Sequence, residues 1–340
     1  MLILNQDNVL INPPVEVSRR KGRVWDKKDR CSFCNKDVTN FSRHLIRNHQ
    51  VEESVIKILK CEKGSRERKQ LIDILRKEGN FSIFFENKTR PVQRPTSNSN
   101  KDYLPTDYLP CKYCKGLYLR TSLRRHAKKC YLNNEKLGTV RYASEGQTLL
   151  AFTESRKKFL NRLRLKTEVF HTMHADRISL IGKSDPIICQ YAEDYIRKHK
   201  RPHIKNLVAN KIRELGRLMI PLQDIYQINT ILEALKPENY DKVVSAVRMI
   251  SGYNETDKTF RAPSLALHFK TILLAVCSAA KTLIMKKDPI IPVTNYEQVL
   301  KDIKKFCELV DYNWKFEMGS LALKDLTEKC TTKSKKNSSN

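Results

Sequence analysis

The sequence predicts a mainly α-helical protein in which two small Cys/His modules are joined by a linker to a C-terminal multi-helix domain. Apolar residues recur at helical spacing through most of the later sequence, and only 10 of the 340 residues are glycine. The earlier sequence instead holds two groups of cysteine and histidine at regular intervals. No alternation of apolar and polar residues predicts a large sheet.

The charge balance predicts a polyanionic partner. A formal net charge of +28 at pH 7 favours DNA, RNA or an acidic membrane face. Residues 1–200 carry 42 Lys/Arg against 22 Asp/Glu, whereas residues 201–340 carry 23 against 15, so the Cys/His modules lie in the more basic part. We expect no membrane span, because the longest uncharged run, Thr271 to Ala280, is about half of what a bilayer requires.

The cysteines outside the two modules show no pairing pattern. They are Cys61, Cys189, Cys277, Cys307 and Cys330. We also expect no secretory signal, so these residues predict reduced thiols in a cytosolic or nuclear setting.

Residues 1–29 are predicted to be a basic N-terminal arm. The cluster Arg19-Arg20-Lys21-Gly22-Arg23 is followed by Lys27-Lys28. Such a run is typical of a nuclear-import signal, of a set of phosphate contacts, or simply of a solvated arm. All three interpretations stay open.

The first module, residues 30–50, has the spacing Cys31-x2-Cys34-x9-His44-x4-His49. A Cys-x2-Cys turn brings two thiolates together, and two histidines on one helical face add two nitrogens, so four donors can converge tetrahedrally on Zn²⁺. Because the protein fills all four positions, the pattern predicts a structural ion and no open catalytic position.

Residues 51–87 are predicted to be a helical extension of the first module. Leu71, Ile72 and Leu75 form an apolar stripe opposite a largely basic face, which predicts a helix that packs against the module. The pair Gly79-Asn80 is a stop signal, so we expect this helix to end there.

Residues 88–109 are predicted to be a linker, because proline, serine and asparagine are dense there. The tandem Asp102-Tyr103-Leu104-Pro105 and Asp107-Tyr108-Leu109-Pro110 at its end is either a docking peptide or, as we favour, an extended lead-in to the second module. The two modules are therefore not expected to form a contiguous array that reads adjacent base triplets.

The second module, residues 110–131, has the spacing Cys111-x2-Cys114-x11-His126-x3-Cys130 and predicts a second structural zinc ion. When the modules are aligned on the first histidine, three pairs of other residues agree: Thr39 and Thr121, Phe41 and Leu123, Arg43 and Arg125. We expect the threonines to cap short helices, the apolar pair to pack under the metal, and the arginines to point outward.

Both modules resemble the two-cysteine two-histidine zinc finger family, the second in its CCHC variant. The intervals of nine and eleven residues between knuckle and helix are shorter than the usual twelve or so, which leaves the β-hairpin geometry open. The resemblance implies helices that reach phosphates or base edges. The candidate contacts are Arg43, Arg47 and Asn48 on the first helix, and Arg124, Arg125, Lys128 and Lys129 on the second.

Residues 144–330 are predicted to be a helical domain, followed by a basic tail at 331–340. Its clearest helices cover His203 to Ile220, open at Pro263-Ser264, and run from Tyr296 to Val310. Basic and apolar residues also alternate at helical spacing over 152–166. Such a helix can lie on phosphates, on a membrane or on its own domain, and the Cys/His modules favour phosphates.

Several phrases resemble a group of invertebrate proteins related to mobile elements of the Crypton, tyrosine-recombinase type. They are Asn40-Phe41-Ser42-Arg43-His44-Leu45, Lys211-Ile212-Arg213-Glu214-Leu215-Gly216-Arg217-Leu218 and Lys236-Pro237-Glu238-Asn239-Tyr240-Asp241-Lys242-Val243-Val244. The resemblance covers roughly residues 30–330. It implies a DNA-gripping helical domain, which in that family precedes a catalytic domain with a tyrosine nucleophile.

We expect no recombinase activity, because the chain lacks a suitably placed His-x-x-Arg element. In His44-Leu45-Ile46-Arg47 the histidine is a predicted zinc ligand, and His174-Ala175-Asp176-Arg177 precedes the region that resembles the DNA-gripping domain. His171 and His174 are a weak candidate for a metal pair and are more simply solvated or packed histidines.

The leading hypothesis is a non-catalytic, zinc-dependent protein of the nucleus that binds nucleic acid, with DNA favoured, and that derives from a truncated or domesticated mobile element. The alternative is a protein-interaction scaffold whose zinc fingers are purely structural. The sequence identifies no protein partner.

Overall fold

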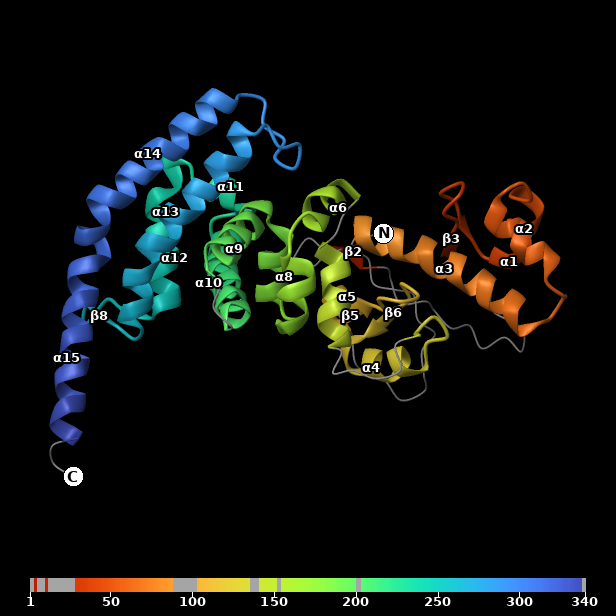
Figure 1. The fold of residues 1–340 in the computed structure, drawn as a ribbon, viewed down its shortest axis with the longest axis horizontal. Helices are drawn as coiled ribbons and strands as arrows, with labels where there is room; N and C mark the ends of the chain where they lie inside the picture. Colours follow the sequence, from red (N-terminus) through yellow and green to blue (C-terminus); the bar gives the residue numbers. More distant parts are fainter. Residues whose placement is uncertain are drawn as a thin grey trace. The chain divides into compact units, whose positions relative to one another are not determined.

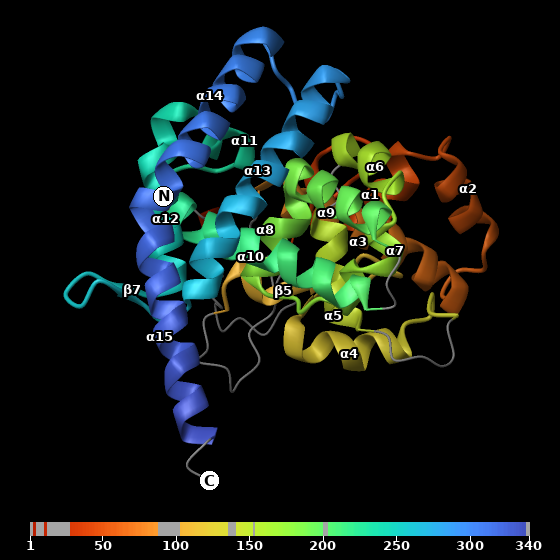
Figure 2. The same ribbon diagram turned by 60° about the vertical axis from the view of Figure 1, so that its left-hand side comes forward.

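The computed structural model describes residues 3–4, 10–11, 28–87, 103–134, 141–151, 154–199 and 203–337. The chain is mainly helical, as predicted, and divides into two compact units, Met1–Leu150 and Ala151–Asn340 (Figures 1 and 2). A short antiparallel pair, β1 (Ile3–Leu4) with β2 (Leu10–Ile11), lies in the predicted N-terminal arm. The basic cluster of that arm and residues 88–102 of the predicted linker lie outside the described residues.

The first module folds as a hairpin followed by helices. Its elements are β3 (Asp29–Arg30), β4 (Asp37–Val38) and α1 (Phe41–Asn48), and its helical extension consists of α2 (Glu53–Lys60) and α3 (Arg66–Asn87). The strands are antiparallel, so the short spacing between knuckle and helix still closes a β-hairpin. The buried core consists of Cys31, Phe41, Leu45, Val55, Ile58 and Leu75, with Leu71 and Ile72 packed against it. The predicted packing of the extension on the module is therefore confirmed.

The predicted stop at Gly79-Asn80 is wrong, because α3 continues to Asn87. A Cβ at Gly79 would lie 2.0 Å from the backbone oxygen of Arg30, so the glycine allows α3 to touch strand β3. Asn80 holds the same strand: its Oδ1 accepts from the Arg30 backbone N–H at 3.0 Å, and its amide donates to Asp29 Oδ1 at 2.8 Å. The pair is thus a docking point within a helix.

The second module repeats the hairpin and helix. Its elements are the 3₁₀ turn η1 (Pro105–Asp107), β5 (Tyr108–Pro110), β6 (Leu117–Leu119) and α4 (Arg120–Lys129). Residues 105–109 of the predicted linker therefore belong to the module, and Tyr108 is fully buried. The next helix, α5 (Tyr142–Ala151), also groups with this unit, since a Cβ at Gly146 would lie 2.3 Å from the Pro110 oxygen. The helical unit thus begins at 151 instead of the predicted 144.

The second unit is a helical assembly with one small hairpin. Its elements are α6 (Glu154–Asn161), α7 (Leu165–Glu168), η2 (Phe170–Thr172), α8 (Arg177–Ser184), α9 (Pro186–Lys198), α10 (Ile204–Asp224), α11 (Ile231–Ala234), η3 (Pro237–Asn239), α12 (Tyr240–Ser251), β7 (Tyr253–Asn254), β8 (Thr259–Phe260), α13 (Pro263–Met285), α14 (Tyr296–Trp314), the π-helical turn η4 (Lys315–Gly319) and α15 (Ser320–Asn337). The three clearest predicted helices are confirmed as α10, α13 and α14.

Helix α13 lies at the centre of this unit and packs against α9, α14 and α15. By length and composition alone it could cross a membrane, and half of its most apolar stretch is buried in the protein. Its buried residues include Phe269, Val276 and Cys277. Burial in a protein core accounts for such an apolar helix, and the absence of membrane association stays a prediction.

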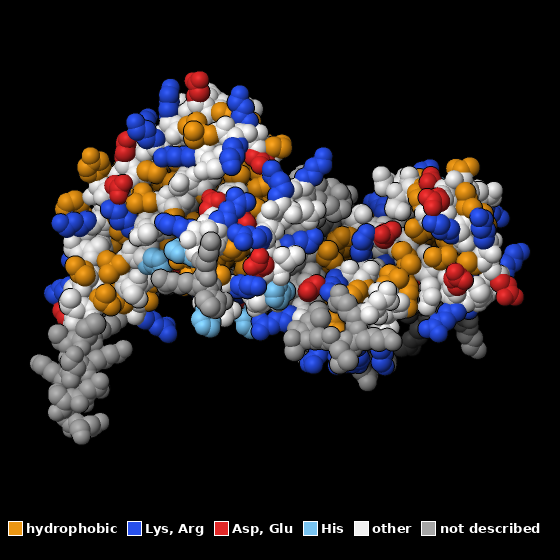
Figure 3. Space-filling model, viewed as in Figure 1, with side chains coloured by type: hydrophobic (Ala, Val, Ile, Leu, Met, Phe, Trp, Pro, Cys, Tyr) orange, Lys and Arg blue, Asp and Glu red, His pale blue; other side chains and the backbone are white. Residues whose placement is uncertain are grey.

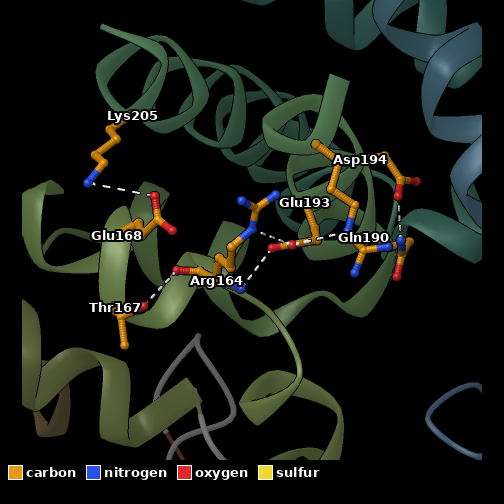
Figure 4. A network of polar contacts seen from close by, with 8 residues as sticks. Arg164, Thr167, Glu168, Gln190, Glu193, Asp194 and Lys205 are labelled. Carbon is orange, nitrogen blue, oxygen red and sulfur yellow. Dashed lines mark hydrogen bonds and ion pairs between the residues drawn. The ribbon is translucent and has the colours of Figure 1, made fainter. Parts of the chain in front are cut away.

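Glu193 on α9 is a buried carboxylate, 1% exposed, and it anchors the turn before α7 (Figure 4). Its Oε2 accepts from the backbone N–H of Arg164 at 2.9 Å, and its Oε1 accepts from Arg197 Nε at 3.3 Å. The buried charge is therefore compensated. Arg164 belongs to the basic stretch 152–166, and Arg162 of the same stretch pairs with Asp288 at 2.7 Å. Arg162 and Arg164 therefore form ion pairs within the helical unit.

Two glycines let α8 and α10 approach closely. A Cβ at Gly216 would lie 2.3 Å from the Ile178 oxygen, and a Cβ at Gly182 would lie 2.5 Å from Ile212 Cγ2. Neither position therefore has room for a larger residue.

We expect Gly216→Ala to lower the free energy of unfolding of the helical unit by about 2–3 kcal/mol, because overpacking outweighs the better helix propensity of alanine. Urea denaturation measures the change. Asn210→Ala, on the exposed side of α10, is the control and should change stability by less than about 0.5 kcal/mol. Equal effects of the two variants would refute the close approach.

Candidate metal centres

The two Cys-x2-Cys knuckles share one backbone conformation. Cys31 donates its N–H to the Lys36 oxygen and accepts from the Asn35 N–H, both at 2.9 Å, and Cys111 makes the two equivalent bonds at 2.8 Å. The residue after the second cysteine is left-handed in each, with φ of 54° at Asn35 and 55° at Lys115. The local backbone therefore turns both cysteine pairs in the same way, although the sequences between ligands differ in length.

The first group has the dimensions of a zinc tetrahedron. Cys34 Sγ lies 3.3 Å from His44 Nε2, Cys31 Sγ lies 3.5 Å from His49 Nε2, and the two Nε2 atoms are 3.2 Å apart. Zinc bonds of about 2.3 Å to sulfur and about 2.1 Å to nitrogen predict roughly 3.6 Å for a sulfur–nitrogen edge and roughly 3.4 Å for a nitrogen–nitrogen edge. The four donors therefore fit Zn²⁺.

The second group brings Cys111, Cys114, His126 and Cys130 together, with each ligand atom within 4.8 Å of the others. Cys114 Sγ lies 3.3 Å from His126 Nε2. The ring of Tyr118 stacks on the His126 ring at a centroid distance of 3.7 Å, which fixes its orientation. All eight predicted ligands are thus assembled into two groups that could each hold a metal ion.

Asn48 supports a ligand. Its side-chain amide lies 2.9 Å from His44 Nδ1, which leaves Nε2 directed toward the other donors. We therefore assign Asn48 to orienting the candidate metal ligand His44, whereas the sequence had suggested a nucleic-acid contact.

The predicted threonine caps are wrong. Asn40 caps α1, because its Oδ1 accepts from the Arg43 N–H, and Thr39 lies one residue earlier. Thr121 lies inside α4, which has no side-chain cap. Phe41 and Leu123 are 2% and 1% exposed, so their predicted packing role is confirmed.

The electrostatics of the second group favour a thiolate. A hydrogen bond from Cys111 is the main cause that lowers the pKa of Cys114 to about 3, and His126 and the cation of Lys77 lower it further. Sharing that proton raises the pKa of Cys111. Because the thiolate is the form that binds metal, the arrangement suits a metal ligand.

Helix α3 contacts both modules. Toward the second it offers Glu78, which pairs with Lys115 at 2.7 Å, and the Gln70 oxygen, which accepts from the Tyr131 hydroxyl at 3.3 Å. Toward the first it offers Arg76, which pairs with Asp29 at 3.1 Å, in addition to the glycine contact. From the sequence, only the linker was expected to connect the two modules. The signal for this additional contact was the presence of acidic residues, such as Glu78, within the otherwise basic face of α3.

Six of the predicted nucleic-acid residues lie on exposed positions: Arg43, Arg47, Arg124, Arg125, Lys128 and Lys129. None forms an ion pair within the part of the chain that the structure describes. The exposed Arg120, four residues before Arg124, extends the row on α4 and was missed by sequence reasoning although the spacing reveals it. Lys and Arg side chains lie along the lower edge over α4 in Figure 3.

The other histidine pair does not form a metal group among the described residues. His171 lies in η2 and His174 in the loop after it. Asp176 caps α8 by accepting from the Ser179 N–H at 2.8 Å, and it pairs with Arg213 at 2.7 Å. Its carboxylate is therefore already used in the fold.

Neither a protein-family model, nor a curated protein, nor a solved structure matches this chain. The functional assignment therefore depends on the geometry of the sites.

Proposed function

We propose that the protein is a non-catalytic, zinc-dependent nucleic-acid-binding protein of the nucleus, with DNA as the favoured polymer. One observation carries the proposal: each closed four-ligand group supports a helix whose outward cations have no acidic partner in the described structure. The resemblance to Crypton-type mobile elements agrees with this function and predicts its origin.

The contrast with α3 strengthens the argument. Lys77 on that helix is paired with Asp73 at 2.6 Å, and Arg76 is paired with Asp29. The finger helices instead keep their charges in solvent, where phosphates can replace water and counterions. Because the fingers are few, contacts to the phosphate backbone should supply most of the affinity, and base contacts should supply less.

A scaffold role is the second candidate, and one observation on the helical unit favours it. Tyr312 and Phe316, one helical turn apart, are 76% and 78% exposed. Exposed aromatic side chains are enriched at protein interfaces. Under this alternative the fingers are purely structural, and their cations are dispensable for binding a partner.

The test is a salt titration of the full, zinc-loaded chain against duplex DNA. If about six phosphates are contacted, affinity should fall on the order of 10³-fold between 50 and 200 mM salt. Replacing Arg124 and Lys128 with alanine should reduce the magnitude of the slope of log K against log salt by about two. Competition with RNA of the same sequence decides the preferred polymer.

The matched control replaces Lys57 and Lys60 with alanine, two exposed lysines on α2 in the same unit. Its salt slope should equal that of the unaltered chain. Binding that is independent of salt, or an equal loss in both double variants, would contradict the assignment to the finger helices.

A further inference from the structure

Helices α13 and α14 bring two cysteines into contact. The packing of α13 on α14 brings Cys307 against the core that contains Cys277, close enough for the two thiols to interact electrostatically, and neither cysteine is in a disulfide. Cys277 is fully buried, whereas Cys307 is partly exposed. Lys281, one turn after Cys277 on α13, places its Nζ 3.7 Å from Cys307 Sγ. A partly exposed sulfur therefore lies between a buried thiol and a cation.

This arrangement puts the negative charge on Cys307. The interaction with the Cys277 thiol is the main cause that lowers the pKa of Cys307 to about 6, and the Lys281 ammonium outweighs the opposing Asp311. The same interaction raises the pKa of Cys277, which keeps its proton. Asp311 itself pairs with Lys270 at 3.2 Å. Lys281 makes no ion pair with any acid in the described residues, so the sulfur is the negative group it faces.

The other described cysteines outside the metal groups lack these features. Cys189 is fully buried and donates to the Gly182 and Lys183 oxygens at 3.6 and 3.5 Å. Cys61 is partly exposed and donates to the Lys57 oxygen, with no second thiol beside it. Among the cysteines whose side chains the structure describes, only the pair on α13 and α14 combines an accessible sulfur, a neighbouring cation and a second thiol within reach.

We propose that Cys277 and Cys307 form a redox-sensitive modification site, in which a peroxide oxidises Cys307 and Cys277 converts the product into a disulfide between α13 and α14. Cys307 is attacked first because it is the accessible thiolate, and Cys277 follows because its burial shields it from the oxidant.

Each step balances. The Cys307 thiolate attacks one peroxide oxygen, an S–O bond forms, the O–O bond breaks, and the leaving oxygen takes a proton to depart as water or an alcohol. The sulfur loses two electrons and the peroxide gains them. Cys277 then loses its proton and attacks the sulfenic sulfur, the S–S bond forms, and the S–O bond breaks with release of water. A thiol reductant restores both cysteines.

The central experiment treats the full, zinc-loaded chain with hydrogen peroxide at pH 7 and maps its peptides without reduction. A peptide linked through Cys277 and Cys307, which disappears after treatment with a thiol reductant, is the expected result. In Cys277→Ala, a sulfenic-acid trap should label Cys307 and no link should form. If the unaltered chain yields no linked peptide, the proposal is overturned.

A second measurement needs no disulfide and separates reactivity from folding. Alkylation of Cys307 should rise with a midpoint near pH 6, whereas an ordinary thiol rises at about 8.5. Lys281→Met should move that midpoint upward and leave the alkylation of Cys61, the internal reference, unchanged. A Cys307 profile that coincides with that of Cys61 in the unaltered chain would exclude a poised thiolate.

Discussion

Removal of zinc is expected to unfold both fingers while the helical unit stays folded. The first module and its helical extension share a cluster of only six buried hydrophobic residues among those described, one of which is the ligand Cys31, so this core is too small to be stable alone. Structural zinc contributes about 10–16 kcal/mol of binding free energy in finger peptides, far more than such a core supplies. The helical unit has its own large core around α13 and contains no predicted metal ligand.

Native mass spectrometry should show two zinc ions per chain, and hydrogen exchange before and after chelation should locate the unfolding. Amide protection should be lost in α1 and α4 and kept in α10 and α13. Cys114→Ala should reduce the stoichiometry to one ion, whereas Cys61→Ala, at a cysteine outside both groups, should leave two. Unchanged protection in α1 and α4 after complete chelation would show that the metal is dispensable for the fold.

The ligand groups and the long helices could be predicted because their signals are local. Four donors within about twenty residues identify each candidate metal site, and helix starts at Pro263 and before Tyr296 are marked by proline and by the capping residue Asn295. The tight spacing hid the hairpins, since strands of two or three residues carry no readable alternation. The knuckle turn between the two strands sets the register of each hairpin.

What the sequence could not reveal depends on contacts between distant residues. Cys277 and Cys307 carry no pairing pattern, because only the packing of α13 on α14 joins them. Asn48 was predicted to contact nucleic acid because it lies on a finger helix, but its side-chain amide contacts His44 Nδ1. In both cases residue type was informative, and the partner was supplied by tertiary structure.

Gly79→Ala is expected to destabilise the docking of α3 on the first finger by about 3 kcal/mol or more, although alanine favours the helix itself by about 1 kcal/mol. The reason is the backbone oxygen of Arg30, which would lie 2.0 Å from the new Cβ and cannot rotate away as a side chain can. Displacement of α3 would also break both hydrogen bonds of Asn80 to the strand. Chemical denaturation followed by hydrogen exchange in α3 measures the loss.

Ser82→Ala is the matched control, because Ser82 is exposed on the same helix and its hydroxyl donates to the Glu78 oxygen within that helix. It should change stability by less than about 0.5 kcal/mol. Both variants should still bind two zinc ions, since the ligands come from the modules themselves. A Gly79→Ala protein as stable as the Ser82→Ala protein would show that α3 does not depend on this contact.

Gly79→Ala also tests whether the two fingers bind DNA together. Because α3 touches the first finger through Gly79 and the second through Glu78, it limits their relative motion within one unit. Two binding sites held together gain affinity through a high effective concentration, which a loose connection reduces. Under the proposed function, Gly79→Ala should therefore weaken DNA binding at least several-fold and leave the slope of log K against log salt unchanged. Arg124→Ala should instead reduce the magnitude of that slope. Identical salt profiles for these two variants would mean that the fingers act independently of α3.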